Sequence, residues 1–111
     1  MGIEYYQGEL NAYCYEVSKG TKPVALMQPK TIYVDKIVEY INQQKLNARV
    51  ETVKGYPEWS IVYIFKDEYL LEVIENVPET PNNIYDHWVL GKLFGYSDAE
   101  IRNYVTKLYD K

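Results

Sequence analysis

The sequence predicts an α+β domain, in which an antiparallel sheet of about five strands is covered by three helices in the order β-β-α-β-β-β-α-α. Three observations predict it. Apolar residues make up 47% of the 111 residues, which is usual for one packed domain spanning residues 1–111. Short segments with alternating apolar side chains flank an amphipathic segment, and the C-terminal quarter carries the capping residues of a tight helix pair.

The first two elements are predicted to form a β-hairpin. Residues 10–17 alternate, which places Tyr13, Tyr15 and Val17 on one face of a strand. Residues 19–23 include a glycine and a proline and are typical of a turn. Residues 24–28 then supply the second strand.

Residues 31–46 have the spacing of an amphipathic helix. One apolar stripe is formed by Val34, Ile37, Val38 and Ile41. We expect Thr31 to cap the amino end, because its hydroxyl can accept a hydrogen bond from an unpaired backbone N–H. The helix should end near Leu46.

Three further strands are predicted over residues 48–53, 59–65 and 69–77, joined by turns at 54–57 and 66–68. Both faces of 59–65 are mostly apolar, which favours a central strand covered on each side. Since short loops join antiparallel neighbours, two consecutive hairpins are the economical connection.

The C-terminal segment 84–109 is predicted to be two helices joined by a tight turn. Asn82 or Asn83 can cap the first helix, and Gly95 stands where a left-handed residue is needed at its end. Ser97 followed by Glu100 is a capping box for the second helix. That helix has apolar residues at helical spacing, which are Ile101, Tyr104, Val105 and Leu108.

The charges are unevenly distributed along the chain. Residues 1–55 hold seven basic and six acidic side chains, a net charge of +1, whereas 56–111 hold five and ten, a net charge of −5. The acids gather in the stretch 58–79, and a negative surface favours a basic partner over nucleic acid. The alternative is a solvated face that keeps the protein soluble. We expect the partner-binding residues to be Tyr56, Glu58, Asp67, Glu68, Glu72 and Glu75.

Tyrosine is unusually frequent, with 13 residues. Its ring and hydroxyl suit interfaces, and they equally suit exposed positions on strands. Both interpretations stay open. A tyrosine-rich sheet edge could also pair with itself in a homodimer.

The sequence predicts no enzyme, metal site or cofactor. His87 is the single histidine, and Asp86 cannot orient its ring because adjacent helical residues point about 100° apart. A capping or solvated role is favoured for His87. Cys14 lacks a nearby positive charge or histidine in the sequence and is interpreted as a small buried hydrophobe. On a strand, Glu72 and Glu75 would point to opposite faces and could not share a proton. Phosphate-binding glycine motifs are absent.

An alternative function is a helix-turn-helix-like regulator that binds nucleic acid through residues 87–106. Leu90, Gly91 and Gly95 fit that pattern, but any tight corner of two helices needs the same residues. The second helix begins with Asp98 and Glu100, which would face phosphates. Binding to nucleic acid is therefore not expected.

The stretch from His87 to Ile101 resembles the C-terminal tails of short proteins of low-GC bacteria and their phages, for which no agreed activity exists. This resemblance implies an accessory protein of a phage or another mobile element. Together with the acidic stretch, it leads us to expect a non-catalytic inhibitor of a host defence or nucleic-acid-processing protein. A cytoplasmic setting without membrane contact is expected, since no apolar run approaches about 20 residues and one cysteine cannot form an internal disulfide.

Overall fold

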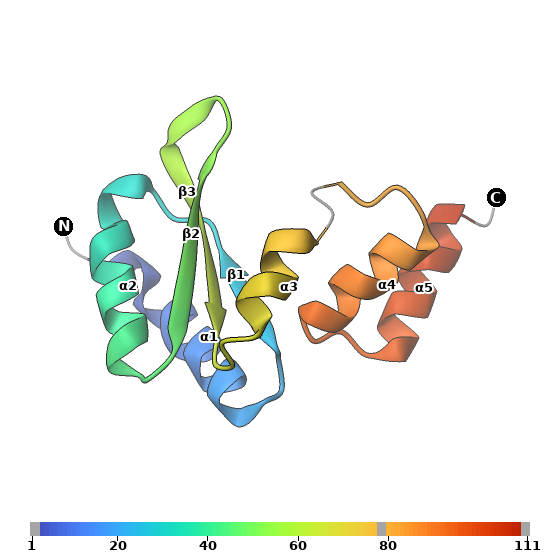
Figure 1. Cartoon of the computed structure of the whole chain (residues 1–111), viewed down its shortest axis with the longest axis horizontal. Coiled ribbons are helices and arrows are strands. Elements are labelled where there is room, and N and C mark those ends of the chain that lie inside the picture. The colour runs from blue at the N-terminus through green and yellow to red at the C-terminus, as the bar shows by residue number, and fades with distance from the viewer. Residues whose placement is uncertain (1–2, 78–79, 110–111) are drawn as a thin grey trace.

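The computed structural model describes residues 3–77 and 80–109. The described part is an α+β fold with five α-helices and a three-stranded antiparallel sheet, and short 3-10 turns precede two of the helices (Figure 1). The elements follow as α1 (Gln7–Lys19), β1 (Val24–Met27), α2 (Val34–Gln43), β2 (Asn47–Val53), β3 (Tyr56–Phe65), α3 (Leu70–Asn76), α4 (Ile84–Leu93) and α5 (Asp98–Tyr109). The predicted class is confirmed, whereas the prediction of about five strands in the order β-β-α-β-β-β-α-α is wrong.

The sheet has the strand order β1-β3-β2, so β3 is central, as predicted. β2 and β3 form a hairpin whose turn includes Gly55 at φ 84°, a backbone conformation that glycine adopts without strain. β1 pairs antiparallel with the other edge of β3, with Val24 opposite Phe65. The predicted hairpin between residues 10–17 and 24–28 is therefore wrong, although the second of these segments is a strand.

Residues 10–17 belong to helix α1, which corrects the strand predicted there. The buried side chains of this helix are Leu10, Cys14 and Val17, at spacings of four and three residues, which is the helical period. The alternation came from Tyr13 and Tyr15, and Tyr15 points to solvent with 65% of its surface exposed. The predicted turn is present: Gly20 ends the helix in the left-handed conformation at φ 82°.

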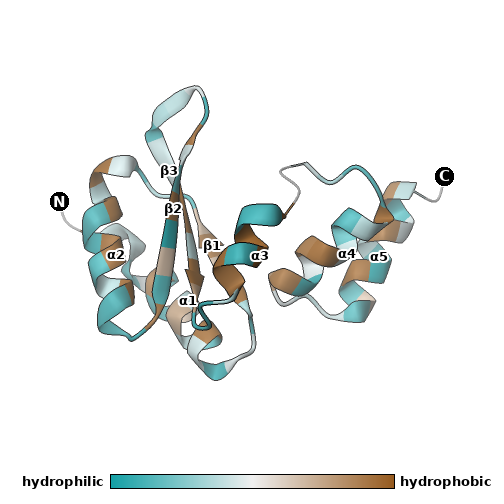
Figure 2. Cartoon of the chain, viewed as in Figure 1, coloured by the Kyte–Doolittle hydropathy of each residue, from teal (hydrophilic) through white to brown (hydrophobic). Residues whose placement is uncertain are grey.

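Helix α2 confirms the predicted amphipathic helix and its buried stripe. Val34, Ile37 and Ile41 are buried, and hydrophobic and hydrophilic residues alternate along the helix in Figure 2. Thr31 lies in a 3-10 turn before it and makes no capping hydrogen bond. Its hydroxyl instead contacts the carbonyl oxygen of Pro57 and the Oγ of Ser60, both at 2.8 Å, which ties the start of α2 to β3.

The main core lies between one face of the sheet and helices α1 and α2. Val62 and Ile64 of β3 contribute to it from the centre of the sheet, and Leu10 and Ile37 contribute from the two helices. The opposite face of β3 is only half-buried at Ile61 and Tyr63. The prediction that both faces of β3 are covered is therefore confirmed only in part. The face with Val62 and Ile64 is covered, and the opposite face is covered only near Phe65.

The strand predicted over residues 69–77 is wrong, because Leu70–Asn76 form helix α3 instead. Leu70 and Ile74 are buried one helical turn apart. They form a second apolar cluster with Val24 and Phe65 of the sheet and Leu93 of α4. This cluster attaches the C-terminal helices to the sheet.

The C-terminal helix pair is confirmed in detail. The side chain of Asn83 accepts a hydrogen bond from Asp86 N at 2.9 Å and caps α4, while Gly95 has φ 83° in the turn. Ser97 and Glu100 form the predicted capping box, because Ser97 N donates to Glu100 Oε1 at 2.9 Å and Glu100 N donates to Ser97 Oγ at 3.1 Å. Within the described ranges, no helix combines the length and apolar content needed to cross a membrane.

Candidate functional site

The six residues predicted to bind a partner are divided between two regions. Tyr56 and Glu58 are exposed at the start of β3, beside the turn of the β2–β3 hairpin. Asp67 and Glu68 are exposed after the end of β3, and the remaining two acids are on α3. The length of β3 between these regions is about 20 Å, at about 3.3 Å per residue. The six residues therefore do not form one continuous patch.

Helix α3 brings three of the acids together. Glu68, Glu72 and Glu75 are spaced by four and three residues, so they lie on one side of the helix. Glu68 precedes the first residue of α3, but its carbonyl oxygen accepts from Leu71 N at 3.0 Å and so continues the helical turn. All three side chains are exposed, and we call this row the acidic stripe. A strand would have divided Glu72 from Glu75, and this corrects the geometry expected from the sequence.

One member of the acidic stripe is paired with a basic residue. Arg49 of β2 donates from Nη1 to Glu75 Oε2 at 2.6 Å, and its Nε lies 3.6 Å from Glu51. Asp67, Glu68 and Glu72 have no ion pair with any other described residue. The free negative charge is thus concentrated at the amino-terminal end of α3. Glu79, the last acid of the stretch, lies outside the described residues.

An exposed aromatic ring accompanies these carboxylates. Tyr69 lies between Glu68 and the first residue of α3 and is 71% exposed. An exposed tyrosine offers a flat apolar surface and a ring face that attracts cations. Tyr69 was not among the residues expected at the site, because the sequence pattern made it the first residue of a predicted strand.

The C-terminal helices form a second candidate surface, and their arrangement is antiparallel. The ring of His87, in the first turns of α4, lies 5.6 Å from that of Tyr109, the last residue of α5. At the other end of the pair, Lys92 and Asp98 form an ion pair next to the turn. The helices therefore stay in contact along their length, whereas those of a DNA-binding helix-turn-helix cross at about 90–120°.

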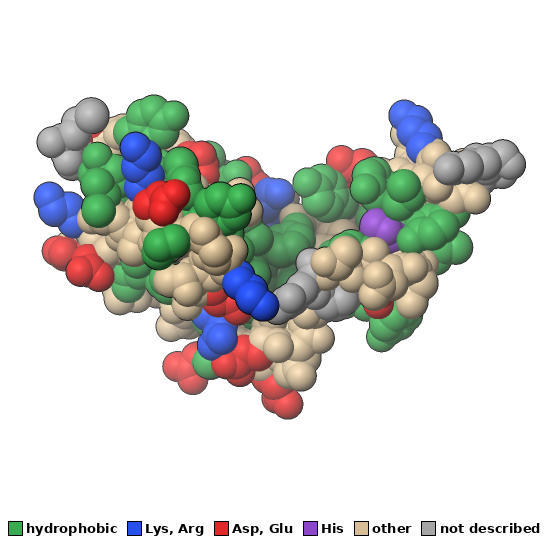
Figure 3. All heavy atoms as spheres, turned by 90° about the horizontal axis from the view of Figure 1, so that it is seen from above, with side chains coloured by type: hydrophobic (Ala, Val, Ile, Leu, Met, Phe, Trp, Pro, Cys, Tyr) green, Lys and Arg blue, Asp and Glu red, His purple; other side chains and the backbone are tan. Residues whose placement is uncertain are grey.

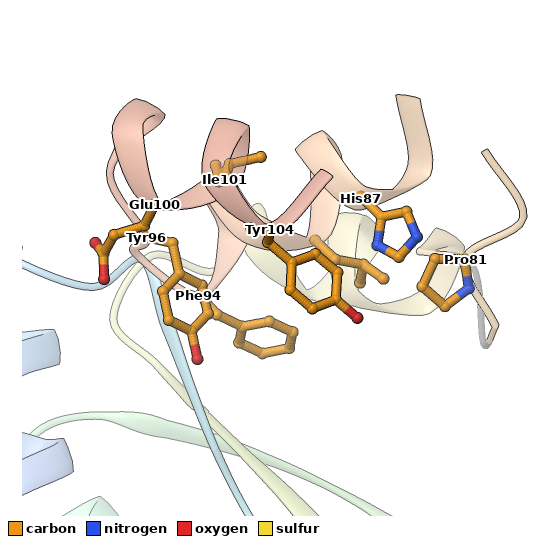
Figure 4. A pocket seen from close by; sticks show the side chains of 9 residues that line it. Pro81, His87, Phe94, Tyr96, Glu100, Ile101 and Tyr104 are labelled. Atoms are coloured by element: carbon orange, nitrogen blue, oxygen red, sulfur yellow. The ribbon is translucent and has the colours of Figure 1, made fainter. Parts of the chain in front are cut away.

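A groove runs along this helix pair. Its volume is about 450 Å³, and Figure 4 shows aromatic rings from both helices and from the turn along it. It is lined by Pro81, His87, Leu90, Gly91, Phe94, Tyr96, Glu100, Ile101 and Tyr104. Lys22, in the loop before β1, contacts two of these lining residues: its Nζ donates to Phe94 O at 3.1 Å and lies 5.5 Å from the centre of the Tyr96 ring.

The ionisable groups of the groove serve structural roles. The pKa of Glu100 is lowered because its carboxylate accepts the capping hydrogen bond from the backbone of Ser97, whose side chain adds a second interaction. His87 is half-buried between the rings of Tyr104 and Tyr109, at 5.4 and 5.6 Å, and not a solvated cap as the sequence favours.

Cys14 is buried in the main core, as interpreted from the sequence, although it lies on a helix and not on a strand. Burial raises the pKa of the Cys14 thiol, which disfavours the reactive thiolate. Among residues 3–77 and 80–109, no group of three or more His, Cys, Asp or Glu side chains is placed to hold a metal ion.

Known proteins give no further guide to these surfaces. No protein-family model, curated protein or solved structure matches the chain. What the acidic stripe and the helix pair can bind is therefore inferred from their residues, contacts and charges.

Proposed function

We propose that this protein is a non-catalytic protein-binding protein, which binds a partner with a basic surface through the acidic stripe and the neighbouring Asp67 and Tyr69. The observation that carries the proposal is that Asp67, Glu68 and Glu72 are exposed and have no ion pair with other described residues. Their charge is available to an outside partner.

The chemistry of this surface suits arginine and lysine side chains. Carboxylates form short charge-assisted hydrogen bonds with guanidinium and ammonium groups, and the Tyr69 ring adds a cation–π surface beside them. Because α3 is anchored by buried Leu70 and Ile74, the carboxylates are held on a regular element. Such preorganisation lowers the entropic cost of binding, and complementary charge raises the rate of association.

We further propose that the partner is a host defence or nucleic-acid-processing protein and that the chain inhibits it. Proteins of this class carry basic surfaces that bind phosphates, and a row of carboxylates can occupy such a surface in place of nucleic acid. The resemblance of residues 87–101 to phage and low-GC bacterial proteins supports an origin in a phage or another mobile element. Tyr56 and Glu58, about 20 Å away at the hairpin, would reach such a partner only across an extended surface.

The test is an affinity capture with charge-reversed variants. The wild-type protein, E68K/E72K and D35K/E39K are immobilised and exposed to a lysate of a low-GC bacterium at low and high salt. Asp35 and Glu39 are exposed on α2, are also four residues apart, and have no ion pair with other described residues, so D35K/E39K changes the net charge equally at a different place.

We expect the wild type and D35K/E39K to retain one basic protein at low salt and E68K/E72K to lose it. Equal capture by all three would show that the acidic stripe is not the binding surface. A gel shift with DNA and RNA at low salt addresses the alternative function of residues 87–106. Salt-sensitive binding to nucleic acid would favour that regulator over the proposal.

A further inference from the structure

Helix α5 has few contacts outside the helix pair. It packs mainly on α4, and its buried side chains are Ile101 and Val105. Neither residue belongs to the two apolar clusters of the sheet. A pair of short helices with so few buried contacts is marginally stable in water, because most helical stability comes from packing of an apolar face.

Helix α4 has apolar residues around its whole circumference. Trp88, Val89 and Leu90 are consecutive, so they point in three directions, and each is only half-buried in the described structure. A helix that is apolar on all sides is usually buried on all sides. The sheet and α5 together leave part of this helix uncovered.

Trp88 and Val89 line a hollow beside Leu70 and Val73 of α3, whereas Leu90 belongs to a separate apolar surface on the side of the groove. We call this second surface the helix-pair face. Tyr96 and Tyr104 are exposed along the groove, Leu108 is exposed one helical turn after Tyr104, and the exposed Tyr109 contacts the ring of His87. Its half-buried residues are Pro81, His87, Leu90 and Phe94. Figure 4 shows Phe94, Tyr96, Tyr104 and His87 projecting from the same side of the two helices. In Figure 3 the imidazole, coloured purple, lies among hydrophobic side chains on the part of the molecule that holds these helices.

We propose that the helix-pair face binds a second copy of this chain, so that two antiparallel helix pairs pack about a two-fold axis into a four-helix bundle. Two-fold contacts are the commonest in soluble oligomers, and they join the same patch on both subunits. Bundles of four helices are a stable solution for short antiparallel pairs. Tyr96 and Tyr104 combine an exposed apolar ring with a polar hydroxyl group, which is more typical of an interface than of a protein core.

The area of the face matches what a dimer needs. A fully exposed tyrosine presents about 200 Å². Exposures of 52% for Tyr96, 57% for Tyr104 and 43% for Tyr109 therefore leave roughly 300 Å² of aromatic surface. A standard dimer buries about 800 Å² on each partner, of which about two thirds, or roughly 500 Å², is apolar. Leu108, at 43% exposure, and the half-buried residues of the groove supply the balance.

The charges at this face are compatible with self-association. Each chain carries a formal net charge of −4, so two copies repel each other wherever acids are dense. The carboxylate that lines the groove is Glu100, whose side chain is held by Ser97. The acidic stripe is on a different helix, α3, so a dimer formed through α4 and α5 leaves both acidic stripes free.

The oligomeric state tests the proposal. Mass is measured by light scattering and sedimentation equilibrium from about 1 μM to about 1 mM, the range in which weak and moderate dimers dissociate. The variant Y104E/L108E places two charges on the helix-pair face at positions already exposed. The control Y5E/Y15E makes the same kind of change at exposed positions, Tyr5 and Tyr15, of the N-terminal helices.

We expect the wild type and Y5E/Y15E to have twice the monomer mass and Y104E/L108E to be a monomer with unchanged helical circular dichroism. A wild type that stays monomeric throughout the range would overturn the proposal, as would a Y104E/L108E variant that remains a dimer. If that variant loses helical signal, amide chemical shifts of the wild type decide the question. Dilution should then shift residues of α4 and α5 selectively, and shifts that are absent there or confined to other elements would contradict a dimer through this face.

Discussion

Gly91 provides the sharpest test of how α4 and α5 pack. A Cβ added at this position would lie 2.6 Å from Ile101 Cγ1 and 2.7 Å from Ile101 Cδ1. Ile101 is itself buried, with 4% of its surface exposed, so it cannot simply swing into solvent. The substitution Gly91→Ala should therefore force the two helices or the Ile101 side chain to shift.

Two effects of opposite sign determine the result. Replacing glycine by alanine inside a helix stabilises by about 0.5–1 kcal/mol, whereas overpacking a close contact costs about 1–3 kcal/mol. We expect G91A to lower the free energy of unfolding by about 1 kcal/mol. Gly8 is the matched control, because it also lies in a helix but an added Cβ would meet nothing within 4 Å. G8A should leave stability unchanged or raise it by a few tenths of a kcal/mol.

Urea unfolding followed by circular dichroism and by tryptophan fluorescence, to which Trp59 of β3 and Trp88 of α4 both contribute, measures both variants. The double variant G91A/I101A completes a mutant cycle, because alanine at position 101 lacks both the Cγ1 and the Cδ1 that the added Cβ would meet, so G91A should cost about 1 kcal/mol less in that background than in the wild type. A G91A protein that is as stable as G8A would refute the close approach of the helices at this point.

Four other outcomes follow from the structure. Leu10→Ala should lower the free energy of unfolding, measured with a chemical denaturant, by about 2–5 kcal/mol, because Leu10 is fully buried. Tyr15→Ala should lower it by less than about 1 kcal/mol, because Tyr15 is exposed. Equal losses for the two variants would contradict helix α1. Ser97→Ala should cost about 1 kcal/mol by removing the cap of α5, seen first as faster amide exchange in that helix. The pKa of Glu100 is lowered in the folded protein, so ionised Glu100 stabilises the fold at neutral pH. This stabilisation is lost as the pH falls below the ordinary carboxyl pKa. The melting temperature of the Glu100→Gln variant should therefore fall less steeply in acid than that of the wild type. Cys14 should react with a thiol reagent only on the timescale of unfolding, and rapid labelling of the native protein would contradict its burial.

The C-terminal helix pair was predictable because its residues act locally. Asn83, Gly95, Ser97 and Glu100 each satisfy backbone groups within a few positions along the chain, so their spacing alone defines where helices begin and end. β3 was predictable over residues 59–65, which are rich in aromatic and β-branched side chains, but it begins at Tyr56, so the assignment of Tyr56 and Pro57 to the turn 54–57 is wrong.

Helices α1 and α3 were missed for two different physical reasons. In α1, Tyr13 and Tyr15 mimic a strand period, although the core is built from the aliphatic and sulfur side chains one helical turn apart. In α3, four apolar residues among seven fit a short strand or a short helix equally well. Packing of Leu70 and Ile74 against the sheet decides between them, and that contact is not visible in the sequence.

The candidate binding residues were predicted in identity but not in arrangement. The acids were recognisable from the uneven charge, yet the error on α3 separated Glu72 from Glu75. The pairing of Glu75 with Arg49 joins residues 26 positions apart, which no local pattern reveals. Likewise, the apolar helix-pair face depends on which sides of α4 the sheet leaves uncovered.

The central claim is that free carboxylates on and before α3 bind a basic protein. Its most direct test is the dissociation constant of the captured partner, measured over a range of ionic strength for the wild type and for E68Q/E72Q. We predict that wild-type affinity weakens steadily as salt rises and that E68Q/E72Q binds less tightly with a shallower salt dependence. A dissociation constant that changes neither with the salt concentration nor with the loss of these two charges would contradict this binding mode.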